Sequence, residues 1–214
     1  MPYPRYFESL GDNCEFGFVQ RMNGLEPGGL LRWAISPPDP LISNIHNDFE
    51  GIFQFANLIP HTDKMISDRK SGLKFHSRME SKEGKFILGD RDLLEVYKEE
   101  WGKISYLKDK LINDFKFPSK HFVYKHNSGI SQSKCHRLAE VISSKGPGRI
   151  LVIHAAEGGK IPGSVERVSD CLYFGFVSEF AKYQSANKFD LSCWMEVIEN
   201  AVRIMPTPAA IDKY

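Results

Sequence analysis

The sequence predicts a mixed α/β fold in which helices cover both faces of a mainly parallel sheet. A strand–turn–helix pattern runs over residues 6–22, and a strand–helix–strand unit follows over residues 121–153. Because a helical crossover returns the chain to the same edge of a sheet, such units pair their strands in parallel. Parallel sheets are buried on both faces, so helices are expected on each side. A chain of 214 residues fits one such domain, residues 1–214, with a loose tail at 205–214.

The first strand is expected at Tyr6–Leu10 and the first helix from Cys14. Between them, the residues Gly11-Asp12-Asn13 tolerate the backbone angles of a tight turn. Apolar side chains recur at helical spacing from Cys14 to Met22, and Gly24 is a natural helix end. This pattern puts a thiol at the start of a helix.

Residues 27–40 are rich in glycine and proline, which predicts an ordered but irregular loop. Trp33, inside this loop, either packs against the core or lines a cleft. Apolar residues then recur at helical spacing in part of 41–58. Alternating side chains predict two strands, at 73–79 and at 85–88.

The turn Glu83-Gly84 is expected to join these two strands into a hairpin. The clearest helix of the chain follows, with one apolar stripe, a cap at Asp90 or Asp92 and an end at Pro118. The later elements are a strand at His121–Tyr124, a helix at Ser133–Ser144 capped by Ser131 or Ser133, a strand at Arg149–Ile153 and a helix at Leu191–Ile204.

The composition is that of an ordinary globular protein, with 42% apolar residues, 26% charged residues and a net charge of +1. A balance so close to neutral provides no general attraction for nucleic acid, so we expect no nucleic-acid partner. The apolar runs are too short for a membrane span and the N-terminus has no apolar signal segment, so we expect a cytoplasmic location. The four cysteines are far apart and form no CxxC pair, which favours reduced thiols and argues against a metal or another cofactor.

Candidate site residues gather at the turns that follow the predicted parallel strands, because sites in open parallel sheets form at the carboxyl ends of the strands. Three turns are expected to meet there, at residues 11–14, 125–129 and 154–159. They contain a thiol, two imidazoles, and amide and carboxylate side chains. The residues expected to orient a catalytic base or to bind substrate are Asp12, Asn13, Asn127 and Glu157.

Cys14 is the candidate nucleophile. A cysteine in the first turn of a helix faces unpaired backbone N–H groups and the positive end of the helix dipole, and both favour the thiolate. The alternative is that Cys14 packs as a small apolar side chain. A thiol nucleophile needs a base, and the candidates are His76, His126 and His154. We favour His76, which alternates with the apolar Phe75 on a strand, or His154, which ends an apolar strand.

The block Ser9–Arg21 (SLGDNCEFGFVQR), followed by Glu26-Pro27 and Leu30–Ala34, resembles an uncharacterised bacterial family described as papain-like cysteine peptidases. Members of that family often occur near or fused to polysaccharide glycosyltransferases. The resemblance implies a glycosyltransferase as a possible partner and a role in polysaccharide biosynthesis. It also implies a different architecture, a papain-like α+β fold with the cysteine helix against a mostly antiparallel sheet.

By the same resemblance, Cys14 matches the family's cysteine and His76 matches a histidine that follows an apolar strand. Asp39 corresponds to the family's aspartate, although this chain has Pro37-Pro38-Asp39-Pro40 where many relatives have Pro-Phe-Asp-Trp. The residues Gly11-Asp12-Asn13 are also similar to the Gly-Asp-Ser start of the SGNH acyl hydrolases. A serine mechanism is disfavoured, because Asn13 stands at the position of their nucleophile.

These observations lead to one favoured function and two alternatives. The favoured one is a thiol-dependent hydrolase or acyltransferase that acts on a peptide or on a glycan-linked acyl group. The first alternative is a non-catalytic ligand-binding or accessory module for surface-polysaccharide biosynthesis, in which Arg32 and Trp33 shape a cleft for a small molecule or glycan. The second is an enzyme that uses His154 and Glu157 in acid–base chemistry without the thiol.

Overall fold

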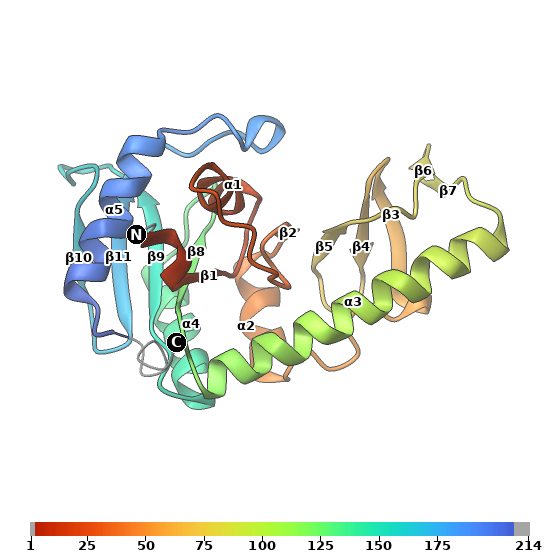
Figure 1. Ribbon diagram of the computed structural model, residues 1–214, viewed down its shortest axis with the longest axis horizontal. Helices are drawn as coiled ribbons and strands as arrows, with labels where there is room; N and C mark the ends of the chain where they lie inside the picture. The colour runs from red at the N-terminus through yellow and green to blue at the C-terminus, as the bar shows by residue number, and fades with distance from the viewer. Residues whose placement is uncertain (1–2, 208–214) are drawn as a thin grey trace.

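A five-stranded sheet forms the centre of the fold in the computed structural model, which describes residues 3–207 (Figure 1). Its strand order is β1-β8-β9-β11-β10, and every pair is parallel except the β10–β11 pair at one edge. The strands are β1 (Phe7–Ser9), β8 (His121–Lys125), β9 (Ile150–Ala155), β10 (Val165–Arg167) and β11 (Leu172–Val177). The prediction of a mixed α/β domain with a mainly parallel sheet is confirmed, and the mostly antiparallel alternative does not describe this sheet.

Helices cover both faces of this sheet, as predicted. The helix α4 (Gln132–Lys145) packs on one face, in the same apolar cluster as Val152 of β9. The helices α1 (Glu15–Met22) and α5 (Leu191–Ile204) pack on the other face, in the cluster that contains Leu151. Successive residues of β9 thus point to opposite clusters, as strand geometry requires.

The strand–helix–strand unit follows the expectation closely. Ser131 caps α4 by accepting a hydrogen bond from the Lys134 backbone N–H, and α4 leads into β9, parallel to β8. The last helix, α5, has the expected bounds. Met205, the first residue of the predicted tail, is buried against the cluster around α5. Residues 208–214 of that tail lie outside the described residues.

A second, antiparallel sheet of four strands was not predicted, and it corrects the expected hairpin. Its order is β2-β5-β4-β3, with β2 (Ala34–Ile35), β3 (Leu58–Thr62), β4 (Met65–Asp68) and β5 (Lys74–His76). The turn Glu83-Gly84 does close a hairpin, but it joins β6 (Ser81–Lys82) to β7 (Lys85–Phe86). β5 pairs instead with β4 and with β2, and the β2 pairing is long-range, so the local pattern did not reveal it.

The segment before β3 also differs from the expectation of partial helix over residues 41–58. The helix α2 (Pro38–His46) begins earlier, because proline is well suited to the first position of a helix. It ends at His46, and the chain then turns through positive φ angles at Asp48 and Phe49. Three short 3-10 helices complete the described elements: η1 (Tyr3–Tyr6), η2 (Phe55–Asn57) and η3 (Tyr183–Ser185).

The long helix α3 (Asp90–Lys116) runs from the small sheet to the end of α4 and so bridges the two parts of the fold (Figure 1). Its cap is Gly89; Asp90 and Asp92 lie in the first turn, where their charges complement the helix dipole. The buried side chains of α3 join the cluster that contains α2, α4 and the small sheet. One face of α3 thereby packs against both parts of the fold.

Candidate active site

Cys14 and His76 meet between the two sheets. The Sγ atom of Cys14 lies 3.6 Å from Nε2 of His76, across 62 residues of sequence. Cys14 caps the start of α1, directly after the turn that leaves β1, whereas His76 ends β5 of the small sheet. On β5, Phe75 is buried and His76 is exposed, as the alternation predicted.

A cleft of about 430 Å³ opens beside this pair. Its floor is apolar and its rim carries a guanidinium, a carboxylate and an ammonium group. The lining residues are Cys14, Phe18, Arg21, Gly29, Leu30, Trp33, Phe53, Phe75, His76, Glu100, Lys103, Ile104 and Leu107. The cleft therefore receives side chains from α1, the loop before β2, the segment before η2, β5 and α3.

Trp33 forms one wall of the cleft. Its ring meets the ring of Phe18 edge-on, with 5.2 Å between their centroids. The guanidinium groups of Arg21 and Arg32 each lie 4.6 Å from the Trp33 ring centroid. Gly17 allows this approach, since a Cβ atom there would lie 2.9 Å from the Trp33 ring. Trp33 combines the two roles considered for it, because it packs against α1 and also lines the cleft.

Arg32 has a supporting position, and it is not among the residues that line the cleft. Its side chain is only 3% exposed and donates hydrogen bonds to the carbonyl oxygens of Gly17 and Leu25. It also pairs with Glu26 at 2.7 Å. The expectation that Arg32 contacts substrate is therefore corrected: it holds the loop that carries Trp33.

The thiol of Cys14 differs electrostatically from the expectation. Burial raises its pKa, while the positive charges of Arg21 and Lys125 act in the opposite direction without outweighing burial. The start of α1 was expected to favour the thiolate. The half-buried position of Cys14 acts in the opposite direction, because a charge is poorly solvated there. The resting side chain is thus a thiol, which needs a base before it attacks.

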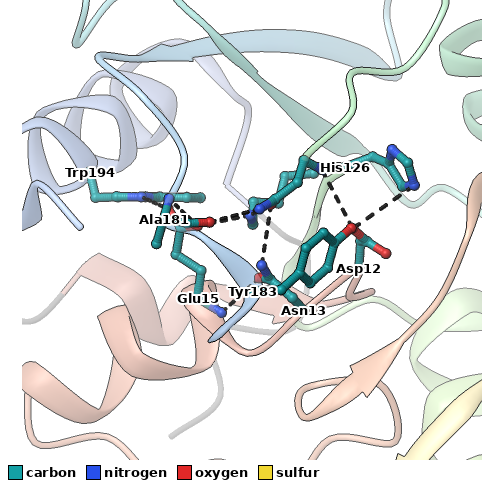
Figure 2. Close-up of polar contacts among 9 residues, drawn as sticks. Asp12, Asn13, Glu15, His126, Ala181, Tyr183 and Trp194 are labelled. Atoms are coloured by element: carbon teal, nitrogen blue, oxygen red, sulfur yellow. Dashed lines mark hydrogen bonds and ion pairs between the residues drawn. The ribbon is translucent and has the colours of Figure 1, made fainter. Parts of the chain in front are cut away.

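Two of the three predicted turns meet at the carboxyl edge of the sheet (Figure 2). The Asn13 side-chain amide donates to Oδ1 of Asn127 at 3.2 Å, and the Asn127 backbone N–H donates to Asp12 at 3.5 Å. Nε2 of His126 lies 4.0 Å from Asp12. These contacts fix the turn that precedes Cys14, so Asp12, Asn13 and Asn127 position the cysteine.

The third turn does not join them. His154 packs its ring against Phe174 and Phe176, at centroid distances of 4.8 and 6.0 Å, and burial lowers its pKa. Glu157 is exposed. The sheet order explains the separation, because β8 lies between β1 and β9. His154 and Glu157 are therefore not brought to Cys14.

The chain after β11, for which no element was predicted, contacts the first two turns where the third turn was expected. The Tyr183 hydroxyl donates to Asp12, and the side-chain amide of Asn127 donates to the Ala181 carbonyl at 2.7 Å (Figure 2). The Ala181 backbone N–H in turn donates to Glu15 at 3.1 Å. The chain after β11 thus folds back across the edge of the sheet and closes the network behind Cys14.

The centre of this network is a buried ion pair that sequence reasoning missed. Nζ of Lys125 lies 2.8 Å from Oε2 of Glu15, and both side chains are at most 1% exposed. Glu15 also accepts a hydrogen bond of 2.8 Å from the Trp194 indole. Burial lowers the pKa of Lys125, and Glu15 offsets part of that shift. The signal in the sequence was a lysine directly after the aromatic and aliphatic residues Phe122, Val123 and Tyr124 of the strand.

The aspartate implied by the family resemblance lies elsewhere. Asp39 is on α2, where it pairs with Lys134 at 2.8 Å and with Arg137 at 3.9 Å, and it does not line the cleft. The carboxylate that shares the cleft with His76 is Glu100 of α3, which was not predicted. The sequence did contain a signal for Glu100: it is a charged residue at the helical spacing of the apolar stripe of α3.

None of the helices in the described part of the chain is long and apolar enough to cross a membrane. Within residues 3–207, no three His, Cys, Asp or Glu side chains are grouped so that they can share a metal ion. Comparisons with protein-family models, curated proteins and solved structures found no match to this chain. The function therefore has to be inferred from the Cys14–His76 pair and its cleft.

Proposed function

We propose that this protein is a thiol-dependent hydrolase or acyltransferase in which Cys14 is the nucleophile and His76 the general base. The observation that carries the proposal is the 3.6 Å contact between Sγ and Nε2 at the edge of a cleft. A nucleophile, a base within reach and adjoining space for a substrate are the minimum that covalent acyl transfer requires.

The reaction proceeds in two halves. His76 removes the proton from Sγ as Sγ attacks the acyl carbon of the substrate, and then gives this proton to the leaving group. The bond to the leaving group breaks and an acyl thioester forms on Cys14. In the second half, His76 takes a proton from water or from an acceptor hydroxyl, whose oxygen attacks the thioester and releases the thiol. Because burial raises the pKa of Cys14, His76 acts as a base during attack rather than as the partner of a preformed thiolate.

Backbone N–H groups at the start of α1 are suited to stabilise the oxyanion. The Glu15 N–H donates to Oδ1 of Asn13 at 2.9 Å, and the Phe18 N–H donates to the Cys14 carbonyl at 2.9 Å. No acceptor within residues 3–207 engages the N–H of Cys14 itself, so this group is available to an oxyanion formed beside Sγ.

The apolar floor of the cleft suits an acyl chain or an apolar side chain of a peptide. The family resemblance adds the suggestion of a glycan-linked acyl group and of a glycosyltransferase partner. A cytoplasmic location stays an expectation from the sequence.

A second candidate function is ligand binding without reaction. The observation that favours it is the wall formed by Trp33 and Arg21, whose guanidinium lies 4.6 Å from the ring centroid. Aromatic and guanidinium groups together bind sugars and anions without any chemistry. This candidate predicts binding that survives removal of the Cys14 thiol.

Ester hydrolysis separates the two candidates. We expect Cys14→Ala to lower the rate of 4-nitrophenyl butanoate hydrolysis to background, and His76→Ala to lower it about 10²- to 10⁴-fold. Cys171→Ser is the matched control, because Cys171 is also half-buried but is not among the cleft residues. Equal activity of the three proteins above background would exclude the thiol mechanism, and activity at background in all three would favour the binding module.

A further inference from the structure

A second cavity, called here the second chamber, adjoins the cleft beside Cys14, and His76 lines both. The second chamber, of about 500 Å³, shares His76, Glu100 and Lys103 with the cleft beside Cys14. Its remaining lining comes from Lys64, Ser77, Arg78 and Glu99, and Cys14 does not contribute to it. The His76 imidazole therefore borders two adjoining spaces, and Cys14 lines only one of them.

The two chambers differ in chemistry. The cleft beside Cys14 has an apolar floor that includes Leu30, Phe53 and Leu107. In the second chamber, by contrast, every lining side chain is polar or charged. An apolar group is stabilised in the first chamber by burial, and a charged group is stabilised in the second by ion pairing.

The balance of charges in the second chamber leaves positive charge available. Arg78 is paired with Glu99. The Glu100 carboxylate accepts hydrogen bonds of 2.7 Å from the Ser77 hydroxyl and from the Arg78 backbone N–H. Within residues 3–207, no carboxylate pairs with Lys64 or with Lys103. Lys64, Arg78 and Lys103 against Glu99 and Glu100 give the lining a net formal charge of +1, and the two unpaired ammonium groups can bind an anionic ligand.

We infer that the site uses an acyl donor with an apolar acyl group and an anionic leaving group, whose carboxylate or phosphate binds Lys64 and Lys103 in the second chamber. This inference rests on the proposed function and adds the substrate class. The acyl carbon lies at Sγ, so the rest of the donor extends past His76. His76 passes the thiol proton to the leaving oxygen as the acyl–oxygen bond breaks, and the departing alcohol keeps its anion on the lysines. Water then enters the vacated chamber and is deprotonated by His76.

Two matched esters test this assignment. The anionic substrate is 3-butanoyloxy-4-nitrobenzoate, and the neutral one is 2-nitrophenyl butanoate, which lacks only the carboxylate. We expect wild type to favour the anionic ester about tenfold in kcat/KM, after correction for uncatalysed hydrolysis. The preference should fall to about one in the double variant Lys64→Met/Lys103→Met, and it should fall in wild type as salt is added. Lys98→Met, an exposed lysine of α3 that lines neither chamber, is the control and should keep the preference.

The possible results separate a failure of the anion-binding inference from a failure of the proposed thiol mechanism. Hydrolysis that depends on Cys14 but shows no preference for the anionic ester would overturn the inference alone. If neither ester is hydrolysed, the proposed function fails for these donors, and binding still tests the chamber. In that case 3-hydroxy-4-nitrobenzoate should shift the His76 imidazole signals in the NMR spectrum of wild type and not of the double lysine variant. Absence of such a shift in wild type would overturn the second chamber as an anion site.

Discussion

Lys125 and Glu15 form an ion pair of 2.8 Å that is closed off from solvent directly behind the cysteine turn. The pair ties the last residue of β8 to the first residue of α1, so it fixes the start of the helix that Cys14 caps. The Trp194 indole and the Ala181 N–H complete the hydrogen bonds of the carboxylate. The position of the thiol is therefore set by groups that never touch the cleft.

Removing one partner of the Lys125–Glu15 ion pair should lower the free energy of unfolding. Lys125→Met leaves Glu15 as a buried charge without its partner, so we expect a loss of about 3–5 kcal/mol in the free energy of unfolding. The double variant Lys125→Met/Glu15→Gln should recover part of that loss, because no uncompensated charge is left. Urea unfolding of the two variants and of wild type measures both values. A double variant less stable than Lys125→Met would contradict this account.

The absence of a side chain at Gly17 lets the Trp33 ring pack closely against α1. In Gly17→Ala, the new Cβ would lie 2.9 Å from the Trp33 ring, so the ring must move or the helix must shift. We expect a loss of about 1–3 kcal/mol in unfolding free energy from overpacking, together with a change in tryptophan fluorescence.

The matched control is Gly102→Ala on the exposed side of α3, where a Cβ would meet nothing within 4 Å. Alanine is the better helix former, so we expect this variant to gain about 0.5–1 kcal/mol. If Gly17→Ala is as stable as Gly102→Ala, the close packing of Trp33 against α1 is not required.

His121 should make the fold sensitive to acid. Burial and the charge of Arg149 lower its pKa from 6.5 to about 4. The folded state disfavours the protonated form of His121. The free energy of unfolding therefore keeps its full value above pH 6.5, where His121 is neutral in both states, and decreases as the pH falls from 6.5 through 4. The shift corresponds to about 3 kcal/mol. Unfolding free energies at pH 7 and pH 4 should therefore differ more in wild type than in His121→Gln, and an equal difference would remove His121 as the cause.

The raised pKa of Cys14 predicts how the thiol reacts with iodoacetamide. Because burial disfavours the thiolate, alkylation of Cys14 should be slow near pH 6.5 and should rise steeply at alkaline pH. The Arg21 charge lowers the pKa of this thiol, so Arg21→Met should move the profile further toward alkaline pH. Peptide mapping after timed labelling measures both profiles, and a plateau already reached at pH 6.5 would mean that the helix start, rather than burial, controls the thiol.

Local patterns were sufficient for β1, β8 and β9 of the main sheet and for its helices, whereas β10 and β11 lie in a segment for which no element was predicted. Strand alternation and helical spacing depend on residues close in sequence, so β8, α4, β9 and α5 were predicted near their observed bounds. The small sheet was not. Its β2–β5 pairing joins residues that are distant in sequence, and β3 and β4 lie where no strand was predicted. The choice between His76 and His154 depended on that sheet, because β5 carries His76 to Cys14.

The other contacts of the site could be predicted from the sequence only in part. The turns at Asp12 and Asn127 were expected to meet because strand ends share one edge, and they do. Glu100 has a spacing signal, since it lies within the apolar stripe of α3, but only the folded chain places it in the cleft with His76. Tyr183 was missed because its segment has neither alternation nor helical spacing, and only the folded chain brings it to Asp12.

The most direct test of the central claim is to trap the acyl group. Wild type is mixed with 4-nitrophenyl butanoate, quenched in acid within seconds and analysed by intact mass and peptide mapping. A butanoyl group on the peptide that contains Cys14, formed far more slowly in His76→Ala and absent in Cys14→Ala, is the predicted result. Acylation of another residue, or equal acylation of Cys14 with and without His76, would contradict the assignment of nucleophile and base.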